Sequence, residues 1–233
     1  MNDMHNALSS AKAAAMKATR KAKRLETFEG VTLPDRMVDT IETIRVATVP
    51  GQVGYRLPDV SNVSTGDLDK AIHDYSQTLV TTEYADKARV GVLVALANRL
   101  NDEYMRFVPE AVKQATPGFE AAALEYKQAV SHLPPAPFSP KVLAQLGWQA
   151  VKAWDDCIAV QKTLESYATW INRDIQGEKP GKFEQWQVLV DVEGDQEAYS
   201  SLARWEQHMV GDDKLNIPLY TAAKNDYTFR LLV

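Results

Sequence analysis

The four histidines are the residues in this sequence most able to do acid–base or metal chemistry. Asp69 and His73 are one helical turn apart, so both side chains can share one helix face. A metal centre needs three or four ligands, and no third ligand accompanies this pair. No Glu precedes a His by three residues, which disfavours the di-metal carboxylate bundles. We interpret Asp69 and His73 as a solvated surface pair and expect no metal and no cofactor.

Two glycine-containing segments resemble ligand-binding loops in part. Gly177–Phe183 is one residue shorter than a phosphate-binding loop, lacks the Ser or Thr after its Lys, and follows a predicted helix where a strand is required. Gly51–Gly54 has the spacing of the loop with which KH domains clamp nucleic acid, but its flanks predict strands. We interpret the first segment as a helix end and the second as a chance match.

Cys157 is the only cysteine, which excludes a disulfide framework within the chain and a multi-cysteine metal site. It lies on the apolar face of a predicted helix, and we interpret it as a small buried hydrophobic residue. The adjacent acids Asp102-Glu103 and Asp155-Asp156 diverge by about 100° on a helix, so neither makes a converging acid–base pair. The sequence therefore predicts no catalytic residue, and we do not expect an enzyme.

Positive charge is concentrated at the start of the chain. Residues 1–25 hold six Lys and Arg against one Asp, whereas the whole chain carries a net charge of −5. Such a cluster can be a solvated helix face that pairs with the acidic body of the chain. It can also neutralise phosphates without reading base sequence, or pair with the acidic surface of another copy. Membrane insertion is disfavoured because the apolar side of this segment is mostly Ala. The candidate contact residues are Lys12, Lys17, Arg20, Lys21, Lys23 and Arg24.

The composition is that of an ordinary globular protein. The chain has 233 residues, of which 45% are hydrophobic and 24% charged. Its longest apolar run, Val90–Ala97, is too short to span a bilayer, and the first residues lack the apolar region of a secretory signal. We therefore expect a cytoplasmic protein, or a virion component if a phage encodes it.

The region 139–177 predicts one uninterrupted amphipathic helix. Ser139 can cap it, Pro140 suits its first position, and Gly177 with Pro180 ends it. Such a rod, about 50 Å long, needs partner helices along its length. Its apolar residues recur at steps of three and four, namely Leu143, Leu146, Ala150, Trp154, Cys157, Gln161, Leu164, Ala168, Ile171 and Ile175.

A second long helical region covers about 64–133. One apolar stripe runs from Leu68 to Leu79 and another from Leu93 to Ala111. We interpret these stripes as out of phase, so either the helix kinks near Thr81 or two helices meet there. Further breaks are expected at Pro109 and at Pro117, because an interior proline removes a helical hydrogen bond.

Helices and a few strands complete the prediction. Residues 3–28 predict an Ala-rich helix with a thin apolar stripe, which is either frayed or packed closely through its small side chains. Alternating residues predict a β-hairpin near 44–57 and strands near 185–192 and 227–233. Residues 34–43 and 196–209 predict short helices. The fold class is mainly α, an elongated bundle of long antiparallel helices with a small β-sheet.

Two domains are predicted from these elements. Residues 1–30 form a basic N-terminal helix or arm, and residues 31–233 form a single, mainly helical domain. Its long helices cover about 64–133 and 139–177, and a small α+β base comes from 31–60 and 180–233.

Three classes of function remain open. The first is a non-enzymatic assembly protein, a helical scaffold that forms homo-oligomers or docks other proteins. Such scaffolds occur in phage virions and mobile elements, which is an association and not a property of the residues. The second is an accessory protein that binds nucleic acid through its basic helix. The third is an enzyme whose site is assembled from scattered residues.

Overall fold

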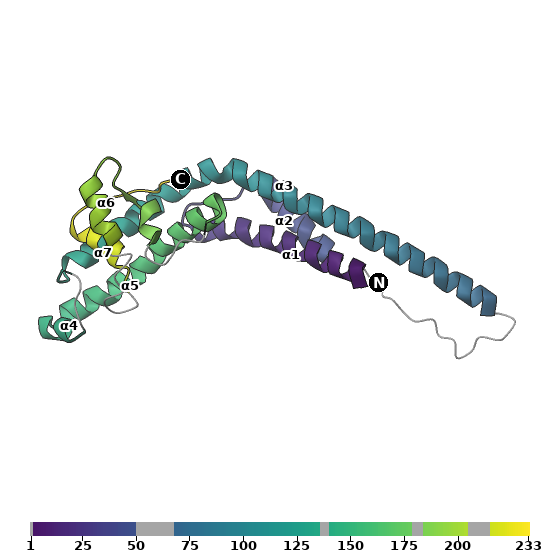
Figure 1. Ribbon diagram of the computed structural model, residues 1–233, viewed down its shortest axis with the longest axis horizontal. Helices are drawn as coiled ribbons and strands as arrows, with labels where there is room; N and C mark the ends of the chain where they lie inside the picture. Colours follow the sequence, from purple (N-terminus) through teal and green to yellow (C-terminus); the bar gives the residue numbers. More distant parts are fainter. Residues whose placement is uncertain (1, 50–67, 136–139, 179–183, 205–214) are drawn as a thin grey trace. The chain divides into compact units, whose positions relative to one another are not determined.

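The computed structural model describes residues 2–49, 68–135, 140–178, 184–204 and 215–233, and these residues are mainly helical (Figure 1). The helices are α1 (Asn2–Arg24), α2 (Asp35–Thr48), α3 (Leu68–Ser131), α4 (Pro140–Leu146), α5 (Trp148–Thr169), α6 (Gln196–Ala203) and α7 (Ile217–Lys224), with the short helices η1 (Leu25–Thr27), η2 (Trp170–Gln176) and η3 (Glu184–Val188). Two short strands, β1 (Val190–Asp191) and β2 (Thr228–Phe229), complete the described elements. No helix among the described residues is both long and apolar enough to cross a membrane.

The chain divides into two compact units. Unit 1 comprises Met1–Glu26 and Leu33–Phe107, and unit 2 comprises Thr27–Thr32 and Val108–Val233. Helix α3 supplies residues to both units.

Helix α3 is one continuous helix of 64 residues, so two separate helices do not meet near Thr81, and the helix does not end at Pro109 or Pro117 as predicted. Positions 79 and 93 are about 3.9 helical turns apart, which is close to a whole number of turns. In an unbroken helix the two predicted stripes therefore lie on nearly the same side. Pro109 and Pro117 are exposed, as are Met105 and Lys113, the residues four positions before them. The carbonyl groups that lose a helical partner therefore lie on the side of the helix that meets water, where solvent can satisfy them.

Unit 1 contains α1, α2 and the part of α3 that ends at Phe107; in Figure 1 α1 and α2 run beside α3, whose first turns extend beyond them. Thr40 on α2 donates a hydrogen bond to Glu103 on α3 at 3.0 Å, and the Lys21 ammonium on α1 lies 4.2 Å from the ring centroid of Tyr104 on α3. Small side chains on α1 allow this close approach, so the packed alternative for the Ala-rich helix is the correct one. Its buried alanines are Ala11, Ala15, Ala18 and Ala22.

Residues 44–48 belong to helix α2, so the predicted first strand of the hairpin is wrong. Met37, Ile41 and Ile44 are buried at helical spacing, and the packing of this stripe outweighs the strand preference of the β-branched residues. The turn and second strand of the predicted hairpin, at 50–57, lie outside the described residues.

Unit 2 is built on the antiparallel packing of α3 and α5, which confirms the predicted antiparallel arrangement of long helices. Tyr126 on α3 adjoins Cys157 on α5, whereas Phe119, earlier in α3, contacts Tyr167, later in α5, at 5.4 Å between ring centroids. Phe28 inserts beside these helices and stacks on Tyr167 at 4.5 Å. The core of unit 2 is therefore rich in aromatic rings.

The predicted uninterrupted helix over 139–177 is wrong at Gly147, which separates α4 from α5. Gly147 has φ 90° and ψ −179°, a conformation essentially reserved for glycine. After Thr169 the chain continues as the π-helix η2, and Gly177, with φ 76°, ends it. The predicted apolar stripe is otherwise largely buried, except that Leu146 is exposed just before the break. Ser139 and Pro180 lie outside the described residues.

A two-stranded antiparallel sheet lies in unit 2, where β1 pairs with β2 and Val190 is opposite Phe229. The strands predicted near 185–192 and 227–233 are thus confirmed in part, toward the end of the first range and near the start of the second. Residues 184–188 instead form the 3-10 helix η3, and Trp186 within it is fully buried. Helix α6 confirms the first part of the helix predicted at 196–209, and residues 205–209 lie outside the described part.

Candidate functional site

The six basic residues predicted as contacts lie along α1. Lys17, Arg20 and Lys23 are exposed, while Lys12, Lys21 and Arg24 are half-buried. Lys21 is directed toward α3, since its ammonium lies over the Tyr104 ring. The structure therefore leaves part of the predicted basic stripe on the surface and directs one of its members into a contact inside unit 1.

The described residues hold no group of three or more His, Cys, Asp or Glu that could bind a metal ion. His73 is exposed, and its Nε2 lies 3.1 Å from Nε2 of Gln77 on the next turn of α3. The side chain of Asp69 and the segments 51–54 and 179–183, which belong to the loop-like motifs, lie outside the described part.

Cys157 is fully buried, as the sequence predicted. Burial raises the pKa of its thiol to about 12. The thiolate population at neutral pH is therefore negligible, and the residue cannot serve as a nucleophile in this state.

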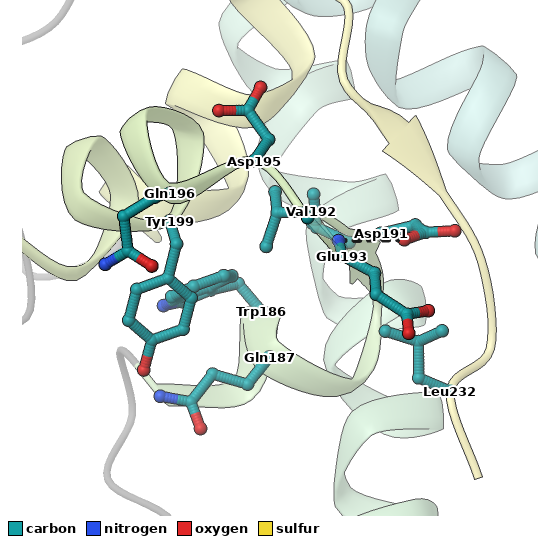
Figure 2. A pocket seen from close by; sticks show the side chains of 11 residues that line it. Trp186, Gln187, Asp191, Val192, Glu193, Asp195, Gln196, Tyr199 and Leu232 are labelled. Atoms are coloured by element: carbon teal, nitrogen blue, oxygen red, sulfur yellow. Dashed lines mark hydrogen bonds between the residues drawn. The ribbon is translucent and has the colours of Figure 1, made fainter.

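A pocket with a volume of about 510 Å³ lies in unit 2 (Figure 2). Its aromatic side is formed by Trp186 and Tyr199, whose ring centroids are 5.5 Å apart. Three carboxylates lie around it, on Asp191, Glu193 and Asp195, and in Figure 2 they point in different directions. These residues form no recognisable motif in the sequence, because they are scattered over a predicted strand and the turn after it.

Two of these carboxylates have structural roles. Asp195 accepts a hydrogen bond of 2.8 Å from the main-chain N–H of Ala198 and so caps α6. Asp191 accepts one of 3.2 Å from the N–H of Glu193 and also pairs with Arg230 at 3.8 Å. No Ser, Cys or His is among the described lining residues, so the pocket provides none of the usual side-chain nucleophiles.

An exposed apolar stripe on α3 offers a different kind of site. The helix buries Leu93 and Leu100 in unit 1, each with no exposed surface. On its opposite side, five exposed residues recur at steps of three and four, and we call them the outer face of α3. They are Val80, Tyr84, Ala88, Gly91 and Ala95.

Polar residues bound the outer face at both ends. His73 and Gln77 continue the same line of positions before it, and Asn98 and Asp102 continue it beyond; all four are exposed. The apolar part spans about 24 Å at 1.5 Å per residue. Tyr84 leaves 67% of its surface exposed and Val80 leaves 52%. This face was not predicted, although its helical spacing is readable in the sequence, because one apolar stripe was expected for each helix.

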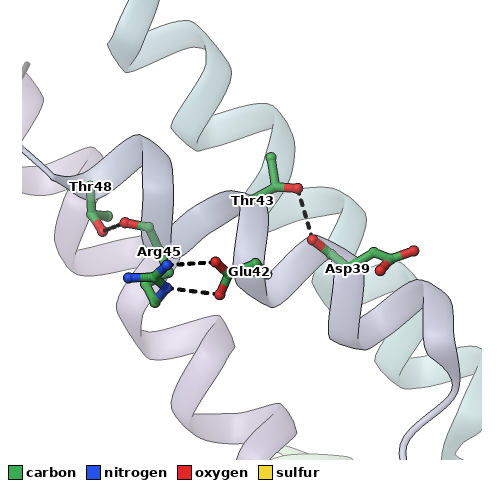
Figure 3. Close-up of polar contacts among 5 residues, drawn as sticks. All are labelled: Asp39, Glu42, Thr43, Arg45 and Thr48. Atoms are coloured by element: carbon green, nitrogen blue, oxygen red, sulfur yellow. Dashed lines mark hydrogen bonds and ion pairs between the residues drawn. The ribbon is translucent and has the colours of Figure 1, made fainter.

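The exposed side of α2, in the same unit, carries polar groups that bond within the helix (Figure 3), beside the exposed Val38 and Val46. Arg45 donates two hydrogen bonds to Glu42 at 2.6 and 2.8 Å, and these contacts lower the pKa of that carboxyl group. The hydroxyl of Thr43 donates to the carbonyl oxygen of Asp39 at 2.8 Å, and that of Thr48 to the carbonyl oxygen of Arg45 at 2.8 Å. These groups are satisfied within α2 and do not require a partner, in contrast to the outer face of α3.

A comparison of this chain with protein-family models, curated proteins and solved structures finds no match.

Proposed function

We propose that the protein is a non-enzymatic assembly protein, a helical scaffold that associates with copies of itself. The observation that carries this proposal is that α3 exposes a line of apolar and small residues from Val80 to Ala95, on the side opposite the buried Leu93. One side is buried in unit 1 by residues such as Leu93, and the other is exposed. A surface helix of a protein that acts alone needs one apolar side, and a second apolar side favours a partner.

Unit 2 supports the same proposal with an exposed apolar patch of its own. Trp148 has 72% of its surface exposed and Leu146 has 54%, on either side of Gly147. Large aromatic side chains are frequent anchors of protein interfaces. Separate apolar patches on the two units give the chain more than one surface for contact, as a scaffold requires.

Nucleic-acid binding through α1 is the second candidate function, and the exposure of Lys17, Arg20 and Lys23 favours it. On this alternative, duplex DNA binds with an affinity that falls steeply as salt is raised, because bound cations release counterions from the phosphates. Replacing these three residues by Gln then abolishes binding. Fluorescence anisotropy of a labelled duplex, at several salt concentrations, measures both effects.

Light scattering of the full chain tests the assembly proposal. We expect the molar mass to rise from the 26.0 kDa of one chain toward a multiple of it as concentration increases from low micromolar to several hundred micromolar. Added DNA is expected to leave this mass unchanged. A mass of one chain at every concentration contradicts self-association, and an increase that occurs only with DNA favours the second candidate.

A further inference from the structure

We infer that the outer face of α3 is a self-docking surface, on which a second copy of the chain lays its own α3 in the antiparallel direction. The two-fold axis passes between Lys87 and Ala88. The inference rests on the proposed self-association and adds which surface is used, in which direction and in which register. A two-fold interface of this kind uses the same patch on both copies.

Size complementarity along the outer face supports this geometry. Tyr84 and Gly91 are equidistant from the axis, so the aromatic ring of each copy meets the glycine of the other. Val80 and Ala95 are likewise equidistant, so a larger side chain again meets a smaller one. Antiparallel helices pack in this way when the side chains of one fill the gaps left by small residues on the other.

The presence of glycine at position 91 also favours a partner that packs against this point of the helix. An interior glycine destabilises a helix relative to alanine, because it loses more conformational freedom on folding. A Cβ atom built on Gly91 meets nothing within 4 Å, so no close approach of the described chain explains the glycine. The ring of Tyr84 from a second copy, seated against the bare backbone, does explain it.

The polar ends of the face also match in the antiparallel direction. His73 falls opposite Asp102, and Gln77 opposite Asn98, because each pair is equidistant from the axis. Two further cations, Lys70 and Arg106, are exposed near these ends of the line. The Asp102 carboxylate of each copy therefore comes close to the imidazole and to positive charge.

A parallel arrangement of the same faces is less favourable. It places Asp102 against Asp102, which brings like charges together, and Tyr84 against Tyr84, which crowds two rings. It also places Gly91 against Gly91, which leaves a gap without packing atoms. Shape and charge thus select the antiparallel direction, and they favour a second copy of this chain over an unrelated apolar helix.

Cysteine cross-linking of the full chain tests the direction and register. In the antiparallel pair the two copies of position 88 lie beside the axis, so we expect Ala88→Cys to form a disulfide-linked dimer on mild oxidation. Val80→Cys alone is expected to stay uncross-linked, since it faces Ala95. The unmodified chain is the control for Cys157, which is buried. Efficient cross-linking through position 80, or none through position 88, overturns the proposed geometry.

A size-swap experiment tests the pairing of Tyr84 with Gly91. Gly91→Tyr alone is expected to weaken dimerisation by about tenfold or more, because two rings then compete for one space. Adding Tyr84→Ala to the same chain restores most of the affinity, since the large and small positions are exchanged. Val46→Glu, on exposed α2, is the matched control and leaves the dimer unchanged. Circular dichroism verifies that each variant keeps its helices.

The possible results separate this inference from the proposed function. If the chain self-associates but neither the Gly91 swap nor the cross-links respond as described, this geometry is wrong and the assembly function stands. If the chain remains a monomer at every concentration, both the proposed geometry and the proposed assembly function are wrong. A swap that restores the dimer, together with selective cross-linking at Ala88→Cys, supports both.

Discussion

The Tyr126 phenol and the Cys157 thiol are neighbours in the interior of unit 2, where α3 and α5 pack against each other. Neither residue has exposed surface. Burial raises the pKa of the thiol to about 12 and that of the phenol well above its usual value. The nearby Glu165 carboxylate raises the phenol pKa further, because its negative charge disfavours a second one. Both groups therefore stay protonated in the folded protein at neutral pH.

The raised pKa values predict a loss of stability at alkaline pH. In the unfolded chain a thiol ionises near pH ~8.5 and a phenol near pH ~10. Above these values the unfolded chain releases protons that the folded chain retains, so the free energy of unfolding falls as pH rises, until the folded pKa is reached. The fall approaches about 1.4 kcal/mol per pH unit for each group. Urea unfolding at a series of pH values measures it.

Cys157→Ala supplies the control for this prediction. The variant loses stability at neutral pH, because it leaves a small gap in the core. Its further loss between neutral and alkaline pH is expected to be smaller than that of the unaltered chain, since one of the ionising groups is gone. An identical pH dependence in both proteins contradicts the assignment to this thiol.

Lys224 is predicted to stabilise the carboxyl end of α3. Its ammonium donates hydrogen bonds to the main-chain carbonyl groups of Val130 at 3.2 Å and of Leu133, at the point where the helix ends. A cation here also complements the helix dipole. We expect Lys224→Met to lower the free energy of unfolding by about 1–2 kcal/mol, as measured by urea denaturation. Lys152→Met, at an exposed position on α5, should change it by less than about 0.5 kcal/mol.

Helical periodicity made much of the fold predictable. The stripe through Ala15 and Ala22 on α1, and the one through Cys157 and Leu164 on α5, were expected from spacing and are buried. Their prediction succeeded because burial of one side of a helix imposes a period near 3.6 residues on the sequence. The break at Gly147 was not predicted, because an isolated glycine within a helical pattern is compatible with either a continuous helix or a positive φ.

The outer face of α3 was not predicted, for a related reason. Its spacing from Val80 to Ala95 is helical, but spacing alone does not say whether a stripe is buried within the chain. The folded structure is needed to show that Leu93 and Leu100 are buried while Val80 and Tyr84 stay exposed. The basic residues of α1 were identifiable from charge, yet the contact of Lys21 with Tyr104 depends on tertiary packing.

The buried alanines of α1 predict a strong difference between neighbouring positions. Ala15 has no exposed surface, whereas Ala14 is exposed on the same helix. Ala15→Leu is expected to destabilise the protein by about 1–3 kcal/mol or more, because the larger side chain forces the helices of unit 1 apart. Ala14→Leu should be nearly neutral. Thermal unfolding of both variants measures the difference, and equal melting temperatures would show that α1 does not pack closely.

The two glycines Gly91 and Gly147 are predicted to respond to alanine in opposite ways. Gly91 is in the interior of α3, where an added Cβ meets nothing within 4 Å, so Gly91→Ala should stabilise the chain at low concentration by about 0.5–1 kcal/mol. Gly147 has space for a Cβ as well, but its φ of 90° is strained for alanine. Gly147→Ala should therefore destabilise the protein by about 1–3 kcal/mol. Urea unfolding of both variants at low protein concentration compares the signs, and a stabilising Gly147→Ala would mean that α4 and α5 join into one helix.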